Sequence, residues 1–146
     1  MKGYSILFLI LTYTLLTSFN YQKESKVPDV KILRYLTAKT SFQSVEYNNG
    51  IVSKWIRFKT PLVVRLNDYQ NYELQAEIKR FDVEKFKSEI DNLSDLKEGI
   101  YPKIYYKIVL NGDTIQTKDF LQKDMPSSIK KIDNLMLKFT TFGISY

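Results

Sequence analysis

The sequence predicts a mainly β domain: an antiparallel sandwich or strongly curved sheet of six to eight strands, with one amphipathic helix. Three observations lead to this fold class. Two Asn-Gly pairs each separate segments of strand-like composition, several further segments alternate apolar with polar residues, and only one stretch has the apolar spacing of a helix. The alternative is a two-layer α+β domain in which the helix lies on the sheet.

The clearest hairpin signal is Asn111-Gly112, which separates the strand-like segments 104–110 and 113–117. Both central residues of a type I′ turn need a positive φ, which Asn and Gly tolerate, and the twist of this turn matches that of paired strands. Every second residue of the first segment is apolar, so we expect one buried face and one mixed face.

Asn49-Gly50 predicts a second hairpin in the same way, between segments 42–47 and 51–59. In its second arm, Trp55 and Arg57 lie two residues apart and therefore share a face of the strand. Polar and aromatic residues occur on both faces of this arm, so the sequence alone leaves open which face is buried.

Three further strands are predicted from composition and alternation. Segment 62–66 follows Pro61, whose missing amide hydrogen interrupts the hydrogen-bonding pattern of the preceding strand. Segment 72–79 alternates cleanly between apolar and polar residues and ends near Phe81, and segment 135–140 alternates again.

One helix is predicted between these strand groups. Asp82 suits the N-cap, because its carboxylate can accept a hydrogen bond from an amide of the first turn. Val83, Phe86 and Ile90 then fall on one apolar stripe, and Gly99 suits the position just past the helix end.

The first twenty residues predict export. A short positive start is followed by the nearly uninterrupted apolar run 4–16, which is shorter than the ~20 residues needed to span a bilayer. We therefore interpret residues 1–20 as a signal peptide; the alternative is an uncleaved membrane anchor formed by residues 3–19. The predicted location is the periplasm, the cell surface or the medium of a bacterium, because an exported chain without cysteine fits a bacterial envelope best.

The rest of the chain is predicted to be one domain. Residues 21–29 are polar and contain Pro28, which indicates a linker, and residues 30–146 show no change of composition and no internal repeat. A chain of this length can form a core without disulfides, and it has no cysteine from which to make one.

The absence of histidine and cysteine excludes most catalytic and metal chemistry. Zinc, copper and haem sites lack their usual ligands, and neither a histidine-assisted serine nor a cysteine nucleophile is possible. We expect no cofactor, no metal and no enzymatic activity. A carboxylate-based hydrolase is the remaining catalytic alternative, but Glu73 and Glu77 would lie about 13 Å apart along the predicted strand. The spacing Ser127-x-x-Lys130 occurs without the other motifs of a serine–lysine enzyme.

The net charge of +6 is spread along the chain, with only four arginines. Nucleic-acid binders concentrate basic residues on one surface and use arginine to read bases, so we expect no nucleic-acid partner. Contact with a membrane is expected only through the N-terminal segment, if that segment is retained.

Aromatic residues provide the candidate binding site, because the chain has 11 tyrosines, 9 phenylalanines and one tryptophan. Exposed Trp and Tyr bury much area on binding and have few torsions to restrict. The leading hypothesis is an exported, non-catalytic interaction module that binds a protein or glycan through a sheet face or loop aromatics. An inhibitor or immunity-type protein that presents the 111–112 hairpin tip to a partner enzyme is the alternative. The candidate binding residues are Trp55, Arg57, Tyr69, Tyr72, Tyr101 and Tyr105.

Overall fold

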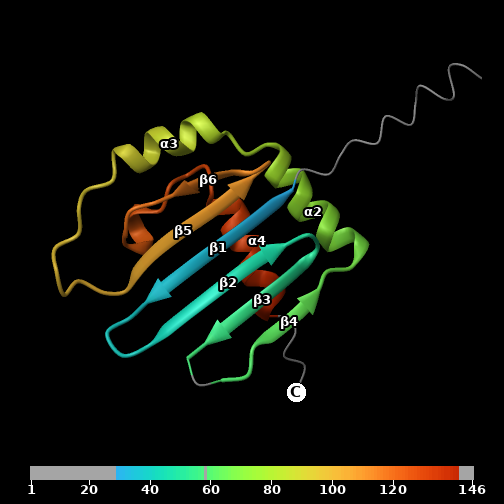
Figure 1. Cartoon of the computed structure of the whole chain (residues 1–146), viewed down its shortest axis with the longest axis horizontal. Coiled ribbons are helices and arrows are strands. Elements are labelled where there is room, and N and C mark those ends of the chain that lie inside the picture. The colour runs from blue at the N-terminus through green and yellow to red at the C-terminus, as the bar shows by residue number, and fades with distance from the viewer. Residues whose placement is uncertain (1–28, 58, 142–146) are drawn as a thin grey trace, which may run out of the picture.

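The computed structural model describes residues 29–57 and 59–141. The predicted signal peptide, the alternative anchor and all of the predicted linker except Asp29 lie outside these residues. Six antiparallel strands form one sheet in the order β4-β3-β2-β1-β5-β6 (Figure 1). The strands are β1 (Val30–Thr37), β2 (Phe42–Asn48), β3 (Ile51–Ile56), β4 (Leu62–Arg65), β5 (Lys103–Leu110) and β6 (Asp113–Gln116).

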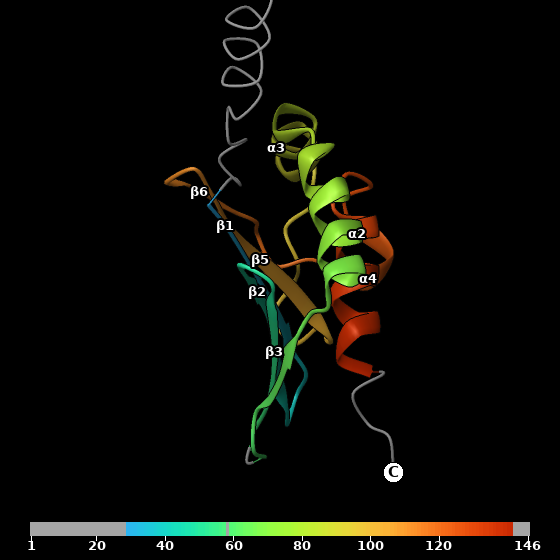
Figure 2. The ribbon, with the colours of Figure 1, turned by 90° about the vertical axis from the view of Figure 1, so that its right-hand side faces the viewer.

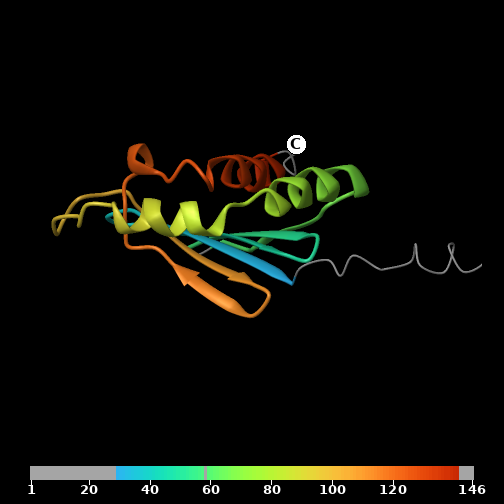
Figure 3. The same ribbon diagram turned by 90° about the horizontal axis from the view of Figure 1, so that it is seen from above.

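Among the described residues, three α-helices lie on one side of the sheet and none covers the other side, which we call the open face (Figures 2 and 3). They are α2 (Asp68–Lys79), α3 (Val83–Asp91) and α4 (Lys130–Thr141), with one 3₁₀ turn at Gln122–Asp124. The structure thus confirms a mainly β, antiparallel fold within the predicted range of strands. The sheet is open rather than a sandwich, and three helices replace the single one that was predicted.

Both Asn-Gly hairpins are confirmed. Asn49 and Gly50 have φ values of 44° and 82°, and Asn111 and Gly112 have values of 52° and 93°. These turns join β2 to β3 and β5 to β6. The predicted strand at 62–66 is confirmed as β4.

The predicted strand 72–79 is wrong, because this segment lies in α2. Asn67 caps the helix and forms a reciprocal capping box with Gln70, which satisfies two amides of the first turn. Leu74 and Ile78 are the buried residues of α2. A separation of four residues places two side chains on one face of a helix, and it also keeps them on one face of a strand. The apolar pattern therefore did not distinguish the two.

The predicted strand 135–140 is wrong for a related reason. It lies in α4, where Ile132, Met136 and Phe139 are buried at helical spacing. Their separations of four and three residues follow the helical period once the stretch is read from Ile132. Alternation over six residues was too short a sample to exclude a helix.

The predicted helix after Asp82 is confirmed as α3, but it is shorter than expected. The Asp82 carboxylate accepts a hydrogen bond from the Lys85 amide, and Phe86 and Ile90 are buried. The helix ends at Asp91, where the Asn92 side chain donates to the Ser88 carbonyl at 2.8 Å. Gly99, with φ of 81°, lies further on in the loop before β5.

The core lies between the sheet and the helices. Strand β1 is at its centre, paired with β2 on one side and β5 on the other. Val30 and Ile32 of β1 point into this core, and so does Arg34, which is 4% exposed. The charge at Arg34 interrupts the apolar alternation of β1.

Candidate functional site

The open face of the sheet carries aromatic side chains at adjacent positions of neighbouring strands. In the strand register, Trp55 of β3 lies opposite Ser44 of β2, Ser44 lies opposite Tyr35 of β1, and Tyr35 lies opposite Tyr105 of β5. Phe42 of β2 is two residues from Ser44 and shares its face. We call Trp55, Tyr35, Tyr105 and Phe42 the aromatic row.

The Tyr35 ring contacts two other rings of the aromatic row, and the row remains accessible to solvent. The ring centroid of Tyr35 lies 5.5 Å from that of Phe42 and 5.6 Å from that of Tyr105. Trp55 is 51% exposed, whereas Ser44 is only 7% exposed, so the neighbouring side chains cover the hydroxyl between them. Because neighbouring strands lie about 4.8 Å apart, the row extends roughly 14 Å across the sheet.

Basic side chains surround the aromatic row. Lys103 and Lys107 flank Tyr105 on the same face of β5, and Lys31 and Arg65 lie on the same face of β1 and β4. Glu46 is the one acidic residue of the described strands on this face, and its carboxylate lies 3.0 Å from the Lys31 ammonium. The open face therefore has a positive charge.

The structure brings together half of the six predicted binding residues. Trp55 and Tyr105 belong to the aromatic row, and Arg57 lies beside it, because the Arg57 amide donates to the Phe42 carbonyl at 3.1 Å. Tyr69 and Tyr72 do not join them, because both lie in helix α2 on the other side of the sheet. Only Tyr72 belonged to the segment that was predicted to be a strand.

Tyr101 precedes β5 and lies close to Lys103, which flanks Tyr105 of the aromatic row. The Lys103 ammonium is 5.6 Å from the centre of the Tyr101 ring, and its second neighbour is the Asp119 carboxylate at 3.7 Å. Sequence reasoning missed Tyr35 and Phe42 of the row, and Ser44 between the rings. Their positions depend on how β1 pairs with β2 and β5, and the β1–β5 pairing joins residues about 70 positions apart.

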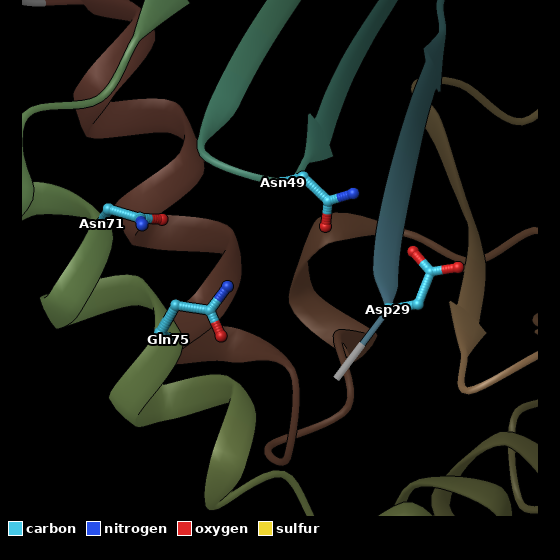
Figure 4. A pocket seen from close by; sticks show the side chains of 4 residues that line it. All are labelled: Asp29, Asn49, Asn71 and Gln75. Carbon is cyan, nitrogen blue, oxygen red and sulfur yellow. The ribbon is translucent and has the colours of Figure 1, made fainter. Parts of the chain in front are cut away.

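A polar pocket lies on the helix side, at the opposite end of the sheet from the aromatic row (Figure 4). We call it the amide pocket, and its volume is about 540 Å³. The Asp29 carboxylate and the carboxamides of Asn49, Asn71 and Gln75 line it. They come from three separate places: the start of β1, the β2–β3 turn and helix α2.

The hydroxyl of Tyr47 connects two of these carboxamides. Gln75 Nε2 donates to it at 2.5 Å, and it donates to Asn71 Oδ1 at 3.3 Å. Burial raises the pKa of Tyr47 above its ordinary value, although hydrogen bonds from Gln75 and the Gly50 amide oppose this rise. The Gln75 Oε1 atom is buried and has no hydrogen-bond partner among the described residues.

A buried ionic cluster joins β1, β5 and α4 beneath the sheet. The Asp133 carboxylate lies 2.8 Å from Arg34 Nε and accepts a hydrogen bond from the Tyr106 hydroxyl. Arg34 also donates to Gln122 at 3.3 Å. Burial raises the pKa of Asp133, and the Arg34 guanidinium opposes that rise. Asp133 and Tyr106 are fully enclosed, so we assign this cluster to stability.

Two sequence motifs were considered as catalytic candidates, the Glu73/Glu77 pair and the Ser127-x-x-Lys130 spacing, and the structure gives the surroundings of both. Glu73 and Glu77 lie one turn apart on α2, not about 13 Å apart on a strand, since residues i and i+4 of a helix are neighbours. Each lies 3.9 Å from a lysine of α4, Lys138 and Lys131 respectively. The Ser127 hydroxyl donates to the Glu89 carboxylate at 2.5 Å. This hydrogen bond joins α3 to the segment that precedes α4.

Within residues 29–57 and 59–141, no three or more acidic side chains come together as metal ligands. In the same part of the chain, none of the helices has the length and apolar content of a transmembrane span. Comparison with protein-family models, with curated proteins and with solved structures found no match.

Proposed function

We propose that this chain is an exported, non-catalytic interaction module of the bacterial envelope or exterior, and that it binds its partner on the open face of the sheet. The aromatic row is the observation that carries the proposal. Three strands and the central β1 present rings side by side, with Trp55 half-exposed and no described helix above them. Rings of this kind are typical of binding hot spots, because they bury a large area at low cost in side-chain entropy.

The charge on the open face favours an acidic glycan over the other partners. Lys103 and Lys107 flank Tyr105 on this face, so a chain that stacks its sugar rings on the aromatic row can pair its carboxylates with these two lysines. A second copy of the same face would bring like charges together, which is unfavourable. A protein partner is the alternative, although lysine is depleted in the centres of protein interfaces.

Export supports this assignment from a separate part of the chain. The apolar segment 4–16 that follows Lys2 has the pattern of a signal peptide, and retention as an anchor would hold the domain at the membrane. In either case the domain meets the glycans and proteins of the envelope or exterior.

The test compares two double variants of the full chain in mild detergent. Trp55→Ala with Tyr105→Ala removes two rings of the aromatic row, whereas Tyr69→Ala with Tyr72→Ala removes two rings from α2 that are more exposed, at 74% and 73%. Binding is measured on immobilised polygalacturonate, with its methyl ester as the uncharged reference. We expect the first variant to bind about thirtyfold more weakly with little change in melting temperature, and the second to bind like the wild type.

Two results would contradict this proposal. A large drop in melting temperature of the Trp55/Tyr105 variant with binding retained would place these rings in the core. Equal binding to the charged and the esterified polysaccharide would exclude an acidic glycan as the partner. A protein captured by the wild type and lost in the same variant would keep the interaction module but replace the glycan by a protein.

An inhibitor or immunity-type role is the second candidate, and the exposure of the 111–112 turn favours it. The Asn111 amide donates to the Asp29 carbonyl at 3.0 Å, so the hairpin tip is held in place. In this case Asp113→Lys, on the tip, would weaken capture of the partner enzyme, and the Trp55/Tyr105 variant would not.

A further inference from the structure

We propose that the amide pocket binds one ring of a neutral sugar or a similar polyol. The inference concerns the helix side of the sheet and does not depend on binding at the open face. Asp29 immediately precedes β1 and is six positions from Tyr35, so the amide pocket and the aromatic row are roughly 20 Å apart. Figure 4 shows the four lining side chains directed toward one space from three segments. The volume of about 540 Å³ is within the range of small-molecule sites.

The hydrogen-bonding capacity of the Gln75 carboxamide is only partly used among the described residues. One polar atom of this carboxamide binds Tyr47, and the other is buried without a partner among the described residues. The nitrogen and oxygen of a carboxamide can exchange places, so the unpaired atom is a donor in one orientation and an acceptor in the other. Because this atom is enclosed, a ligand can bond to it only if the Gln75 side chain turns toward the pocket, and that bond would then satisfy an otherwise unfavourable unpaired group.

The composition of the lining selects a hydroxyl as that ligand group. Asn49 offers a donor and an acceptor, whereas Asn71 and Gln75 each use one polar atom on Tyr47; a hydroxyl can partner a donor or an acceptor. Asp29 contributes only acceptors and the single formal charge of the lining, which disfavours an anion. Calcium is also disfavoured, because the lining has a single carboxylate to balance its two positive charges.

The pocket is held in shape before any ligand binds. Asn71 and Gln75 are one turn apart on α2, and the capping box that starts this helix ends at Gln70, the residue before Asn71. On the opposite side, the β2–β3 turn is fixed by the positive φ of Asn49 and Gly50. A Cβ built on Gly50 would lie 3.6 Å from Asn71 Oδ1, so the turn backbone approaches the pocket closely. Preorganised groups lose less entropy on binding.

The experiment measures sugar binding by NMR of the side-chain amides in the full chain in mild detergent. Methyl glucoside is the probe, and glucuronate and glucosamine are its negatively and positively charged counterparts. We expect saturable shifts of the side-chain amide signals of Asn49, Asn71 and Gln75 with the neutral sugar, and weaker binding of glucuronate. The signals of Asn111, in the equivalent turn, should not move.

Two variants with one matched control test the site. Asn49→Gly removes a lining carboxamide and keeps a residue that accepts positive φ, and Asn71→Ala removes another from a helix that favours alanine. Each should bind the sugar about threefold to tenfold more weakly, the effect of one neutral hydrogen bond. Asn111→Gly makes the same substitution in the other hairpin and should bind like the wild type.

The proposal fails if methyl glucoside gives no saturable shift at about 100 mM, a hundredfold excess over a millimolar Kd. It also fails if glucuronate binds more tightly than the neutral sugar, or if Asn111→Gly weakens binding as much as Asn49→Gly. Because the Trp55/Tyr105 variant leaves this pocket intact, it should bind methyl glucoside normally, which separates this inference from the open-face proposal.

Discussion

Strand β1 contributes one residue to an ion pair on each face of the sheet, and the two pairs differ in their exposure to solvent. On the open face, Lys31 and Glu46 lie 3.0 Å apart with side chains that are 45% and 28% exposed. On the covered face, Arg34 and Asp133 lie 2.8 Å apart and are almost wholly buried. The distances are nearly equal, so the surroundings of the two pairs, and not their lengths, should decide what each contributes to stability.

The aromatic residues differ in the same way. Tyr106 and Phe120 stack on the covered face with ring centroids 6.0 Å apart, and both are about fully buried. Tyr35 and Tyr105 pair on the open face at 5.6 Å, where their rings can still meet a partner. One face thus uses rings and charges to hold the fold, and the other leaves similar groups available for binding.

The largest effect is expected from breaking the buried pair. Asp133→Ala leaves Arg34 buried without its counterion and should lower the free energy of unfolding by about 3–5 kcal/mol. Glu46→Ala breaks the pair on the open face and should cost less than about 1 kcal/mol. Urea unfolding of the two variants beside the wild type measures both values.

A double variant tests whether the loss of stability in Asp133→Ala arises from the unpaired charge of Arg34. Arg34→Met with Asp133→Leu removes both charges and should be more stable than Asp133→Ala alone, because no uncompensated charge is left in the core. If Asp133→Ala and Glu46→Ala cost the same, the contrast between the two faces does not hold.

The sequence predicted the parts of the fold that depend on local chemistry. The turns at Asn49-Gly50 and Asn111-Gly112 need residues that accept positive φ, and the cap at Asp82 needs a side-chain acceptor. In each of these cases, the local geometry requires a particular type of residue, and that residue can be recognised directly in the sequence. Helix α2 was mistaken for a strand because its buried residues, Leu74 and Ile78, are four apart, a separation that both periods allow. Helix α4 was mistaken because six alternating residues are too few to exclude a helix.

The candidate site was predicted only in part, because it depends on strand order. Trp55 and Tyr105 could be selected as exposed aromatics, but they become neighbours of Tyr35 only through the β1–β2 and β1–β5 pairings. The amide pocket was not predicted at all. Its carboxamides come from a turn and a helix that had been taken for a strand, and single Asn and Gln residues have no pattern to identify them.

An intermediate effect on the free energy of unfolding is expected at the two hairpin turns, because they fix which residues lie on each face of the sheet. A slip of one residue in a hairpin would exchange the faces, so the turns that set the register matter to both. Gly112→Ala places a Cβ at a φ of 93° and should cost about 1–2 kcal/mol, although the added atom itself meets open space. Asn111→Gly should change stability by much less, since glycine accepts a positive φ. Thermal unfolding of both variants measures this; a neutral Gly112→Ala would show that the turn does not hold the register.

The smallest effect is expected in the helical layer, where Glu89 of α3 joins the start of α4. Its carboxylate accepts hydrogen bonds from the Ser127 hydroxyl at 2.5 Å and from the Ser128 amide at 3.1 Å. Burial raises the pKa of Glu89, but the bonds from both serines and the charge of Lys85 outweigh it, so the pKa is lowered overall.

A lowered pKa in the folded state stabilises the protein above the ordinary value of 4.5 for this carboxyl, and that stabilisation is lost as the pH falls through the lowered pKa. Glu89→Gln should therefore be less stable than the wild type at pH 7, and the difference should shrink near pH 3. We expect less than about 1 kcal/mol, because water still reaches the carboxylate. Urea unfolding at both pH values tests this, with Glu84→Gln as a control on the same helix. An equal loss in the control would assign the effect to helix charge and not to the serine contacts that join α3 to α4.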